Sequence, residues 1–326
     1  MKTFFNKLHY SKNSGLSLLL LPFSFFYYMA VSFRNFLYDR GLLKNTKLSA
    51  FVISIGNITT GGTGKTPVTC EIANYLNKQG KKVAVISRGY GGKLNNKKTN
   101  IISSGRSGEK IYYNAELAGD EPYWIAKNSP GTVVITGKDR IKSGKFAINE
   151  FNAEVLILDD GFQHRKLHRD LDIVLVDSEK LYGNGFLLPA GPLREPVSEL
   201  RRATRIIKPE KYCEKINGIN RVLAFTGIAQ PDSFFKFLEE QSIEIIIKKV
   251  FPDHYLYTEE DIKTLCDEAQ KVDAEALITT EKDIVKIEPI LDKVGSQIPI
   301  HALKLKVNLD VENILQTFLQ GRQNLL

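Results

Sequence analysis

A strand, a glycine-rich loop and a helix follow one another without interruption between residues 51 and 79. This succession restricts the possible fold more than any other feature of the sequence. The apolar run Phe51–Ile55 predicts a buried strand, GNITTGGTGKTP over residues 56–67 predicts a loop, and apolar residues at 68, 72, 73 and 76 predict a helix over about Lys65–Gln79. A strand that passes directly into a helix is typical of α/β proteins. We therefore expect an α/β fold.

Further runs rich in Val and Ile alternate with helical stretches, as expected of a mostly parallel sheet with helices on both faces. Strands are predicted at Lys82–Ser87, Thr132–Thr136, Val155–Leu158 and Ile173–Val176, and helices at 119–128 and 138–150. The alternation restarts near residue 218, with strands at Val222–Phe225, Ile243–Val250, Ala276–Thr279 and Ile300–Leu305 and helices at Asp232–Gln241 and Glu259–Lys271. We expect a core domain over residues 48–218 and a smaller α/β domain over residues 219–326, or else an extension of the same sheet.

The loop after the first strand is similar to a phosphate-binding loop, although Thr59 stands where the pattern G-x-x-x-x-G-K-[ST] has its first glycine. Its glycines can adopt the backbone angles of a phosphate cradle, and the following helix N-terminus converges on the same place. Lys65 is expected to reach the β- and γ-phosphates, and the Thr66 hydroxyl to bind Mg²⁺. The expected nucleotide-binding residues are Thr60, Gly61, Gly62, Thr63, Gly64, Lys65, Thr66 and Pro67. This indicates a P-loop NTPase-like core; a turn that uses glycine for its geometry alone is the alternative.

Two adjacent carboxylates, Asp159 and Asp160, follow the apolar run Val155–Leu158. Neighbouring carboxylates at a strand end repel each other unless a cation or a hydrogen-bond donor compensates them. A second acidic metal ligand at a strand end is also what a phosphate-binding loop requires. We expect one of the two to bind Mg²⁺ directly and the other to act through water or to position a neighbour. A solvated acidic turn is the alternative.

A base near the acceptor hydroxyl assists phosphoryl transfer to an alcohol. Asp120 opens a predicted helix within Gly119-Asp120-Glu121-Pro122, and from the residues alone it is as well explained by helix capping as by catalysis. His254, in FPDH at the end of a strand of the second unit, can face the same cleft. A lone histidine is more often structural than catalytic.

The uncharged run NSGLSLLLLPFSFFYYMAVSF over residues 13–33 is just long enough to cross a bilayer, which takes about 20 apolar residues. Pro22 interrupts the run, two tyrosines lie inside it, and basic residues flank both of its ends, contrary to the positive-inside rule. Residues 1–50 carry seven basic groups and one acid, so most of the net charge of +8 lies beside this run. We expect residues 1–47 to form a helical segment lying in or dipping into the inner face of a membrane. A spanning helix and a buried core helix are the alternatives.

Composition argues against several other classes of protein. Cys70, Cys213 and Cys266 contain no C-x-x-C pair, which argues against a disulfide framework or a zinc site and for a reducing compartment. A nucleic-acid partner is not expected, because the basic excess adjoins an apolar segment instead of forming a stripe among aromatic platforms. The oligomeric state is not readable from the sequence.

Two other classes of nucleotide-binding protein fit less well. Membrane-recruited partitioning ATPases have a lysine where this loop has Thr60. GTPases carry D-x-x-G and N-K-x-D motifs, but Gly161 directly follows Asp160, and residues 280–283 read T-E-K-D. A lipid-independent regulatory ATPase and a GTPase are therefore kept only as alternatives.

Taken together, the chain resembles the tetraacyldisaccharide 4'-kinase family of Gram-negative bacteria. The resemblance rests on LLLPFSFFY, YDRGLLK, GNITTGGTGKTP, SRGYGGK, GDEP, GKDR, LDDGFQHRKLHRDLDIVLVD, GNGFLLPAGPLREP, FPDHY and TEKD, in this order over roughly residues 18–283. The family also has threonine at the position of Thr59. RIIKPEKY over residues 205–212 and the stretch 284–326 carry little of the resemblance.

The resemblance implies a kinase that transfers the γ-phosphate of ATP to the 4'-hydroxyl of a tetraacylated glucosamine disaccharide 1-phosphate, giving lipid IVA in lipid A biosynthesis. It implies Mg²⁺ as cofactor and a location on the cytoplasmic face of the inner membrane. Asp120 would be the catalytic carboxylate, assisted by His254, with Lys65 and Asp160 also taking part in catalysis. Arg88, Arg140 and Arg194 are candidate contacts of the substrate's 1-phosphate or of the nucleotide, without further assignment.

Overall fold

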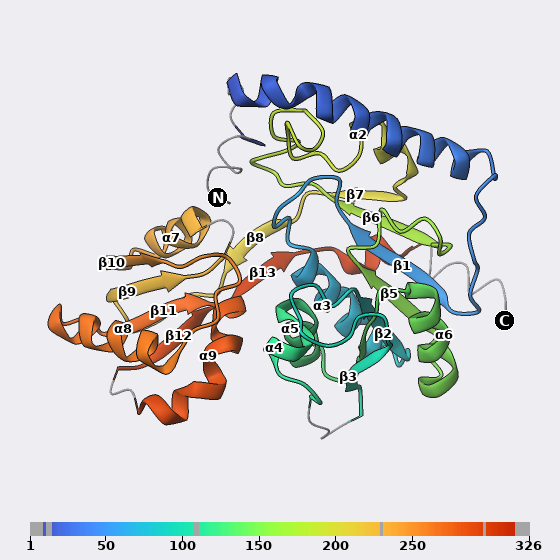
Figure 1. Ribbon diagram of the computed structural model, residues 1–326. Helices are drawn as coiled ribbons and strands as arrows, with labels where there is room; N and C mark the ends of the chain where they lie inside the picture. The colour runs from blue at the N-terminus through green and yellow to red at the C-terminus, as the bar shows by residue number, and fades with distance from the viewer. Residues whose placement is uncertain (1–8, 11–14, 107–110, 229–230, 296–297, 317–326) are drawn as a thin grey trace.

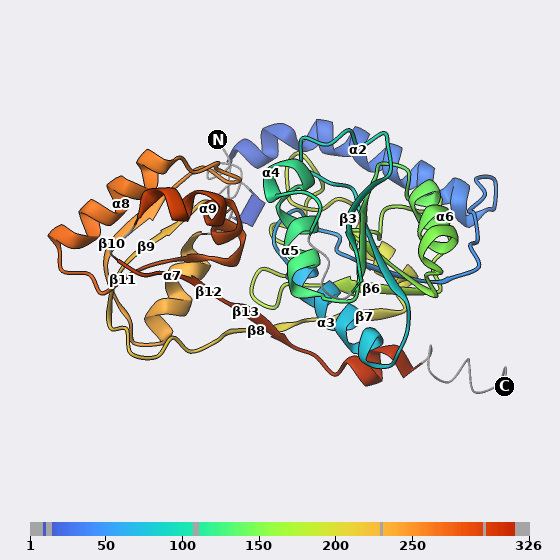
Figure 2. The same ribbon diagram turned by 90° about the horizontal axis from the view of Figure 1, so that it is seen from below.

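The computed structural model describes residues 9–10, 15–106, 111–228, 231–295 and 298–316 of the 326-residue chain. Figures 1 and 2 show two lobes, each built on its own sheet, joined by a ribbon formed by β8 and β13. The long helix α2 lies along one side of the larger lobe.

The larger lobe contains a seven-stranded sheet in the order β3-β4-β2-β5-β1-β6-β7. Its strands are β1 (Phe51–Gly56), β2 (Val83–Ser87), β3 (Asn100–Ser104), β4 (Val133–Thr136), β5 (Val155–Asp159), β6 (Leu171–Leu175) and β7 (Arg205–Ile207). All neighbours are parallel except the edge pair of β3 and β4, so the predicted mostly parallel α/β sheet is confirmed. The two edge strands, β3 and β7, were not predicted.

Helices cover both faces of this sheet because successive residues of a buried strand point to opposite sides. Ile53 and Ile55 pack with α3 (Lys65–Lys78) and α5 (Asp120–Asn128) in one cluster. Val52 packs with α6 (Arg140–Phe151) in another. A four-residue helix, α4 (Ala115–Ala118), directly precedes α5.

The smaller lobe has a four-stranded, fully parallel sheet in the order β10-β9-β11-β12. It comprises β9 (Arg221–Thr226), α7 (Pro231–Glu240), β10 (Glu244–Val250), α8 (Glu259–Lys271), β11 (Ala276–Thr280), α9 (Glu281–Val294) and β12 (Ile300–Leu303). Helix α9 was not predicted. Its start carries a capping signal, since the Thr280 side chain accepts a hydrogen bond from the backbone N–H of Asp283.

The ribbon pairs β8 (Glu210–Cys213) antiparallel with β13 (Leu305–Asn308). The strand predicted over residues 300–305 is confirmed as β12, but its predicted end is wrong: β12 ends at Leu303, and Leu305 begins β13 in a different sheet. Val307 of β13, together with Ile314 and Leu315, packs into the α3 side of the larger lobe's core. The domain division at residues 47/48 and 218/219 stays a prediction, and we propose that the chain after residue 304 belongs with the ribbon and the larger lobe.

Helix α2 (Gly15–Asp39) runs continuously through Pro22. Its length, and the mean hydropathy of 1.8 over its most apolar 18 residues, would suffice to cross a membrane. Only 17% of that stretch is buried, which excludes a core helix. Ser17, Ser24, Val31 and Asn35 are buried against the protein. The large apolar side chains left exposed on this helix are Leu16, Leu18, Leu19, Phe23, Phe25, Phe26, Tyr28, Met29, Phe33 and Phe36.

Candidate active site

The glycine-rich loop joins β1 to α3 and has the backbone geometry expected of a phosphate cradle. Gly61 and Gly64 have positive φ angles of 120° and 87°, and Gly64 is the N-cap of α3. Thr59 forms an antiparallel bridge with Leu193, and the N–H of Thr60 donates to Pro192 O at 2.8 Å. The non-glycine position is thus paired with a neighbouring loop, and the conformations that require glycine come after it.

A cavity of about 550 Å³ opens beside this loop, between the two lobes. Among the predicted site residues, its lining includes Gly61, Gly62, Thr63, Gly64, Lys65, Thr66, Pro67 and His254. The smaller lobe and the ribbon contribute further residues, such as Phe234, Lys236, Lys282 and Lys211. Thr60, Asp120, Asp159 and Asp160 do not line the cavity. Glu121 and Asp253 do, and they are the sequence neighbours of Asp120 and His254.

Asp160 forms a bidentate ion pair with Arg194. The two guanidinium nitrogens donate to its two carboxylate oxygens at 2.8 and 3.0 Å, and Lys65 Nζ lies 3.6 Å away. Lys65 Nζ also donates to Asn57 Oδ1 at 3.2 Å, which places it between the loop and the carboxylate. Burial alone raises the pKa of Asp160, but the charge of Lys65 and the hydrogen bonds from Arg194 outweigh it and hold that pKa well below its usual range.

Asp159 ends β5 and is only 2% exposed. Ser87 Oγ donates to its Oδ2 at 3.3 Å, and Arg140 donates to its backbone carbonyl at 3.3 Å. Burial, followed by the negative charges of Glu121 and Asp160, raises the pKa of Asp159 well above its usual range. Arg140 is itself buried, and it does not line the cavity.

The Asp159 carboxylate is suited to a hard cation. Its Oδ1 is buried and accepts no hydrogen bond from the described residues. Within the described parts of the chain, no group of three or more His, Cys, Asp or Glu side chains could hold a metal on its own. Mg²⁺ commonly binds through one or two carboxylates together with substrate phosphates. Asp159 and the Thr66 hydroxyl, beside a phosphate cradle, fit that pattern.

Asp120 is the first residue of α5, after Gly119, and its side chain is 11% exposed. Gly119 has a φ of 93°, and a Cβ there would lie 2.8 Å from Tyr90 O, so this turn requires glycine. His254 Nδ1 lies 2.9 Å from Asp120 Oδ2. Lys286 Nζ of α9 lies 3.3 Å from the same oxygen. The structure therefore brings Asp120 and His254 together across the two lobes, 134 residues apart in the chain.

Comparisons with known proteins point to one family. A family model described as Tetraacyldisaccharide-1-P 4'-kinase matches residues 16–221 and 209–324. The chain belongs to this family. The tetraacyldisaccharide 4'-kinase of Syntrophus aciditrophicus is 40% identical over 325 residues, covering 85% of this chain and 86% of the relative. That of Aquifex aeolicus is 37% identical over 327 residues, covering 91% and 96%. The resemblance seen in the sequence is confirmed.

The tetraacyldisaccharide 4'-kinase fold is also matched at the level of structure. A crystal structure of "apo" form LpxK from Aquifex aeolicus in complex with ATP superposes with a TM-score of 0.76 at 35% identity. The match covers 94% of this chain and 99% of that one.

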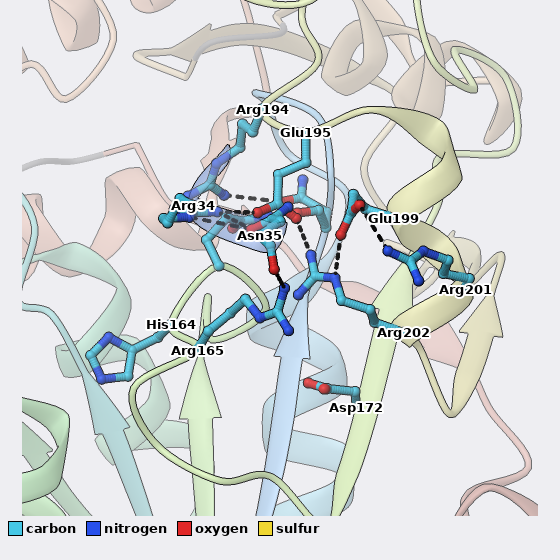
Figure 3. A network of polar contacts seen from close by, with 12 residues as sticks. Arg34, Asn35, His164, Arg165, Asp172, Arg194, Glu195, Glu199, Arg201 and Arg202 are labelled. Carbon is cyan, nitrogen blue, oxygen red and sulfur yellow. Dashed lines mark hydrogen bonds and ion pairs between the residues drawn. The ribbon is translucent and has the colours of Figure 1, made fainter. Parts of the chain in front are cut away.

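Sequence reasoning missed a charge network behind Arg194. Arg34 of α2 and Arg202 both contact Glu195, whose side chain is fully buried, and the Arg34 contact measures 2.5 Å (Figure 3). Tyr27 of α2 donates to Arg194 O at 2.9 Å. The motif LREP was the only sequence signal for this network. The pairs Arg34–Glu195 and Tyr27–Arg194 are 161 and 167 residues apart, so no local pattern indicates them.

Two lysines near the site were also missed. Lys211 of β8 donates to Gly62 O in the phosphate loop at 3.2 Å and pairs with Asp177 at 2.9 Å. It lies in RIIKPEKY, where the family resemblance is weak. Lys286 lies three residues beyond the TEKD motif, and its position in the sequence gives no indication that it reaches Asp120.

Proposed function

We propose that this protein transfers the γ-phosphate of ATP to the 4'-hydroxyl of tetraacyldisaccharide 1-phosphate, giving lipid IVA. The observation that carries the proposal is the match to the tetraacyldisaccharide-1-P 4'-kinase family over nearly the whole chain. The site supports it, because a phosphate-binding loop and a histidine paired with a carboxylate meet at one cavity.

The larger lobe provides the nucleotide half of the site. The loop amides and Lys65 bind the ATP phosphates, and Thr66 and Asp159 would hold Mg²⁺. The ion would neutralise charge on the phosphate oxygens during transfer. Asp160 keeps Lys65 and Arg194 beside the loop, since it contacts both cations. Asp159 is the better candidate for direct metal binding, because both oxygens of Asp160 are already occupied by Arg194.

Asp120 provides the acceptor half. Although burial raises its pKa, the hydrogen bond from His254 and the charge of Lys286 outweigh this effect and lower the pKa of Asp120 below its usual value. The carboxylate is therefore ionised at neutral pH and can accept the proton of the sugar hydroxyl. His254, which lines the cavity, orients the carboxylate.

Helix α2 would place the protein on the cytoplasmic face of the inner membrane. Its exposed side is rich in Phe and Leu, whereas Ser24, Tyr27 and Arg34 contact the loop over residues 186–195. A helix fixed lengthwise to the larger lobe is better placed to lie in the interface than to cross the bilayer.

The decisive experiment incubates the purified full-length protein with labelled ATP, Mg²⁺ and tetraacyldisaccharide 1-phosphate in detergent micelles, followed by separation and mass analysis of the lipid. We expect a product heavier by one phosphate at the 4' position, and no product with Lys65→Ala. Absence of lipid phosphorylation under conditions in which ATP binds would overturn the proposal. ATP hydrolysis that depends on self-association and not on the lipid would favour a regulatory ATPase.

A further inference from the structure

A buried lysine in α9 has so far entered only through the effect of its charge on the pKa of Asp120. The Lys286 side chain is 3% exposed, and its Nζ lies between two carboxylates, 3.3 Å from Asp120 Oδ2 and 3.3 Å from Asp283 Oδ1. A lysine is almost never so fully buried unless it is paired, because removing an ammonium group from water is costly. Both carboxylates are thus needed to keep this cation in place, and one of them is the candidate base.

Asp283 anchors Lys286 to the smaller lobe. Its side chain is completely buried. Its Oδ2 accepts hydrogen bonds from Thr226 Oγ1 at 2.8 Å, from the backbone N–H of Gly227 at 3.0 Å and from Thr280 Oγ1 at 2.8 Å. Because Oδ2 is fixed by three donors, Oδ1 has a fixed direction, and the Lys286 ammonium group is held at a set position relative to β9 and α9.

His254 and Lys286 approach the same oxygen of Asp120. Both contacts are to Oδ2, whereas Oδ1 receives no hydrogen bond from the parts of the chain that the structure describes. A single contact from His254 would leave the carboxyl group free to rotate and to exchange its two oxygens. A second contact from an anchored cation restricts that rotation, so that Oδ1 stays the oxygen without a partner among the described residues.

We propose that Lys286 is a positioning residue for phosphoryl transfer: its ion pair holds Oδ2 of Asp120, so that Oδ1 accepts the proton of the acceptor hydroxyl. The inference rests on the kinase function proposed above and extends the Asp120–His254 pair to a chain of four groups that ends at the buried Asp283.

The charged surroundings predict how the site responds to the loss of Lys286. The charged and titratable groups that face Asp120 from the elements packed against it are His254, Asp253, Lys286, Asp283, Lys282 and Glu121. Lys282 pairs with Glu121 at 3.2 Å, so its charge is already partly compensated. Without Lys286, Asp120 loses an adjacent positive charge and faces an uncompensated Asp283. Both changes raise the pKa of Asp120.

The test compares Lys286→Met and Lys286→Arg with the wild-type protein, with kcat and KM for both substrates measured from pH 5 to 9. For Lys286→Met we expect kcat to fall about 10- to 100-fold, as for a lost charged hydrogen bond. The acidic limb of the kcat profile should move up by about 1 pH unit. The KM for ATP should stay within about twofold of the wild-type value, because the nucleotide half is untouched. Lys286→Arg retains the charge and should keep the limb in place.

The matched control is Lys127→Met. Lys127 pairs with Glu288 at 2.5 Å and so also joins α5 to α9, but at the surface, with side chains 40% and 36% exposed. Its kinetics should match those of the wild type. If Lys286→Met does not fold, Lys286→Gln is used instead, since it keeps a donor without the charge and should show the same shift of the limb.

An unchanged kcat and acidic limb in Lys286→Met would overturn the proposal. Equal losses of activity in Lys286→Met and Lys286→Arg with an unmoved limb would overturn it too, because that result marks a purely structural lysine. Failure of the wild-type protein to phosphorylate the lipid is a separate outcome, which contradicts the proposed function before any variant is compared.

Discussion

The carboxylates Asp160 and Asp120 serve the same proposed reaction but are held in different ways. Asp160 contacts Arg194 and Lys65, which both belong to the larger lobe. Asp120 lies in the larger lobe, but His254 and Lys286, which hold it, belong to the smaller one. The carboxylate of the nucleotide half is therefore held within one lobe, whereas the carboxylate of the acceptor half requires both lobes in contact.

The two halves of the site also differ in the groups that hold Arg194 and Asp120 in place. Arg194 is supported by α2, because the Tyr27 hydroxyl donates to its backbone carbonyl. Arg34 of the same helix forms an ion pair with the adjacent Glu195 (Figure 3). Asp120 is backed by Lys286 and the buried Asp283. A substitution in one half of the site should accordingly leave the other half largely intact.

The largest expected effect is on turnover. Asp120→Ala removes the proposed base, and kcat should fall by about 10²–10⁴-fold, the usual contribution of a general base. ATP affinity should change little, because the nucleotide half does not include Asp120. Steady-state kinetics with the lipid acceptor, combined with ATP binding by calorimetry, measure both quantities. Unchanged turnover would rule out this role for Asp120.

A large effect on stability is expected at Glu195. Glu195→Gln leaves Arg34 and Arg202 without their shared buried partner, and breaking such a pair costs about 3–5 kcal/mol. Arg34→Met should cost less, about 1 kcal/mol, because Arg34 is 39% exposed and Arg202 still compensates Glu195. Urea unfolding of the two variants gives both values. Equal losses would mean that the two arginines do not share the buried charge as described.

A moderate effect is expected for the nucleotide half alone. Arg194→Met releases Asp160, so the Mg²⁺ and ATP concentrations needed for half-maximal rate should rise about tenfold, corresponding to one lost charged contact. The acidic limb of the kcat profile, which reports Asp120, should stay where it is. Titration of Mg²⁺ at several pH values checks this. A shifted limb would show that the two halves are not separate.

The smallest expected effect is on the pH dependence of stability, through His164 in the larger lobe. Burial, followed by the charges of Arg140 and Arg169, lowers the pKa of His164 to about 4. Between pH 6.5 and 4 the unfolded chain therefore binds a proton that the folded protein does not, and stability falls as the pH falls through this window. Between pH 7 and pH 5, the free energy of unfolding of His164→Asn should fall by about 1 kcal/mol less than that of the wild type. This value includes a discount for the partial exposure of His164. Urea unfolding at both pH values measures the difference, and identical pH dependence would contradict it.

The sequence predicted the parts of the molecule that depend on local pattern. The inner strands of the larger sheet (β4, β2, β5, β1 and β6) and the loop over residues 56–67 follow from runs of apolar residues and from glycine spacing. Edge strand β7 and the ribbon strands β8 and β13 could not be predicted, because three or four residues of mixed polarity carry no period. Helix α9 was missed although Thr280 and Asp283 form a capping signal at its start.

The same distinction between local pattern and long-range contact applies to the residues of the site. The sequence suggested Lys65, Asp159 and Asp160 because each stands next to a recognisable strand or helix end. For Asp120, the residues alone did not distinguish a cap from a catalytic group, and only the resemblance favoured the latter. Lys286 and Glu195 depend on contacts between segments far apart in the chain, for which a single sequence contains no signal.

The polar inner side of α2 has a consequence for the proposed association with a bilayer. Because Ser24, Tyr27 and Arg34 fix the rotation of the helix about its own axis, the direction of its apolar side is set by the protein and not by the lipid. Once that side enters the membrane, tilt and height of the cavity above the lipid surface are determined together. A lipid acceptor could then keep its acyl chains in the bilayer while its sugar headgroup reaches the site, without leaving the membrane.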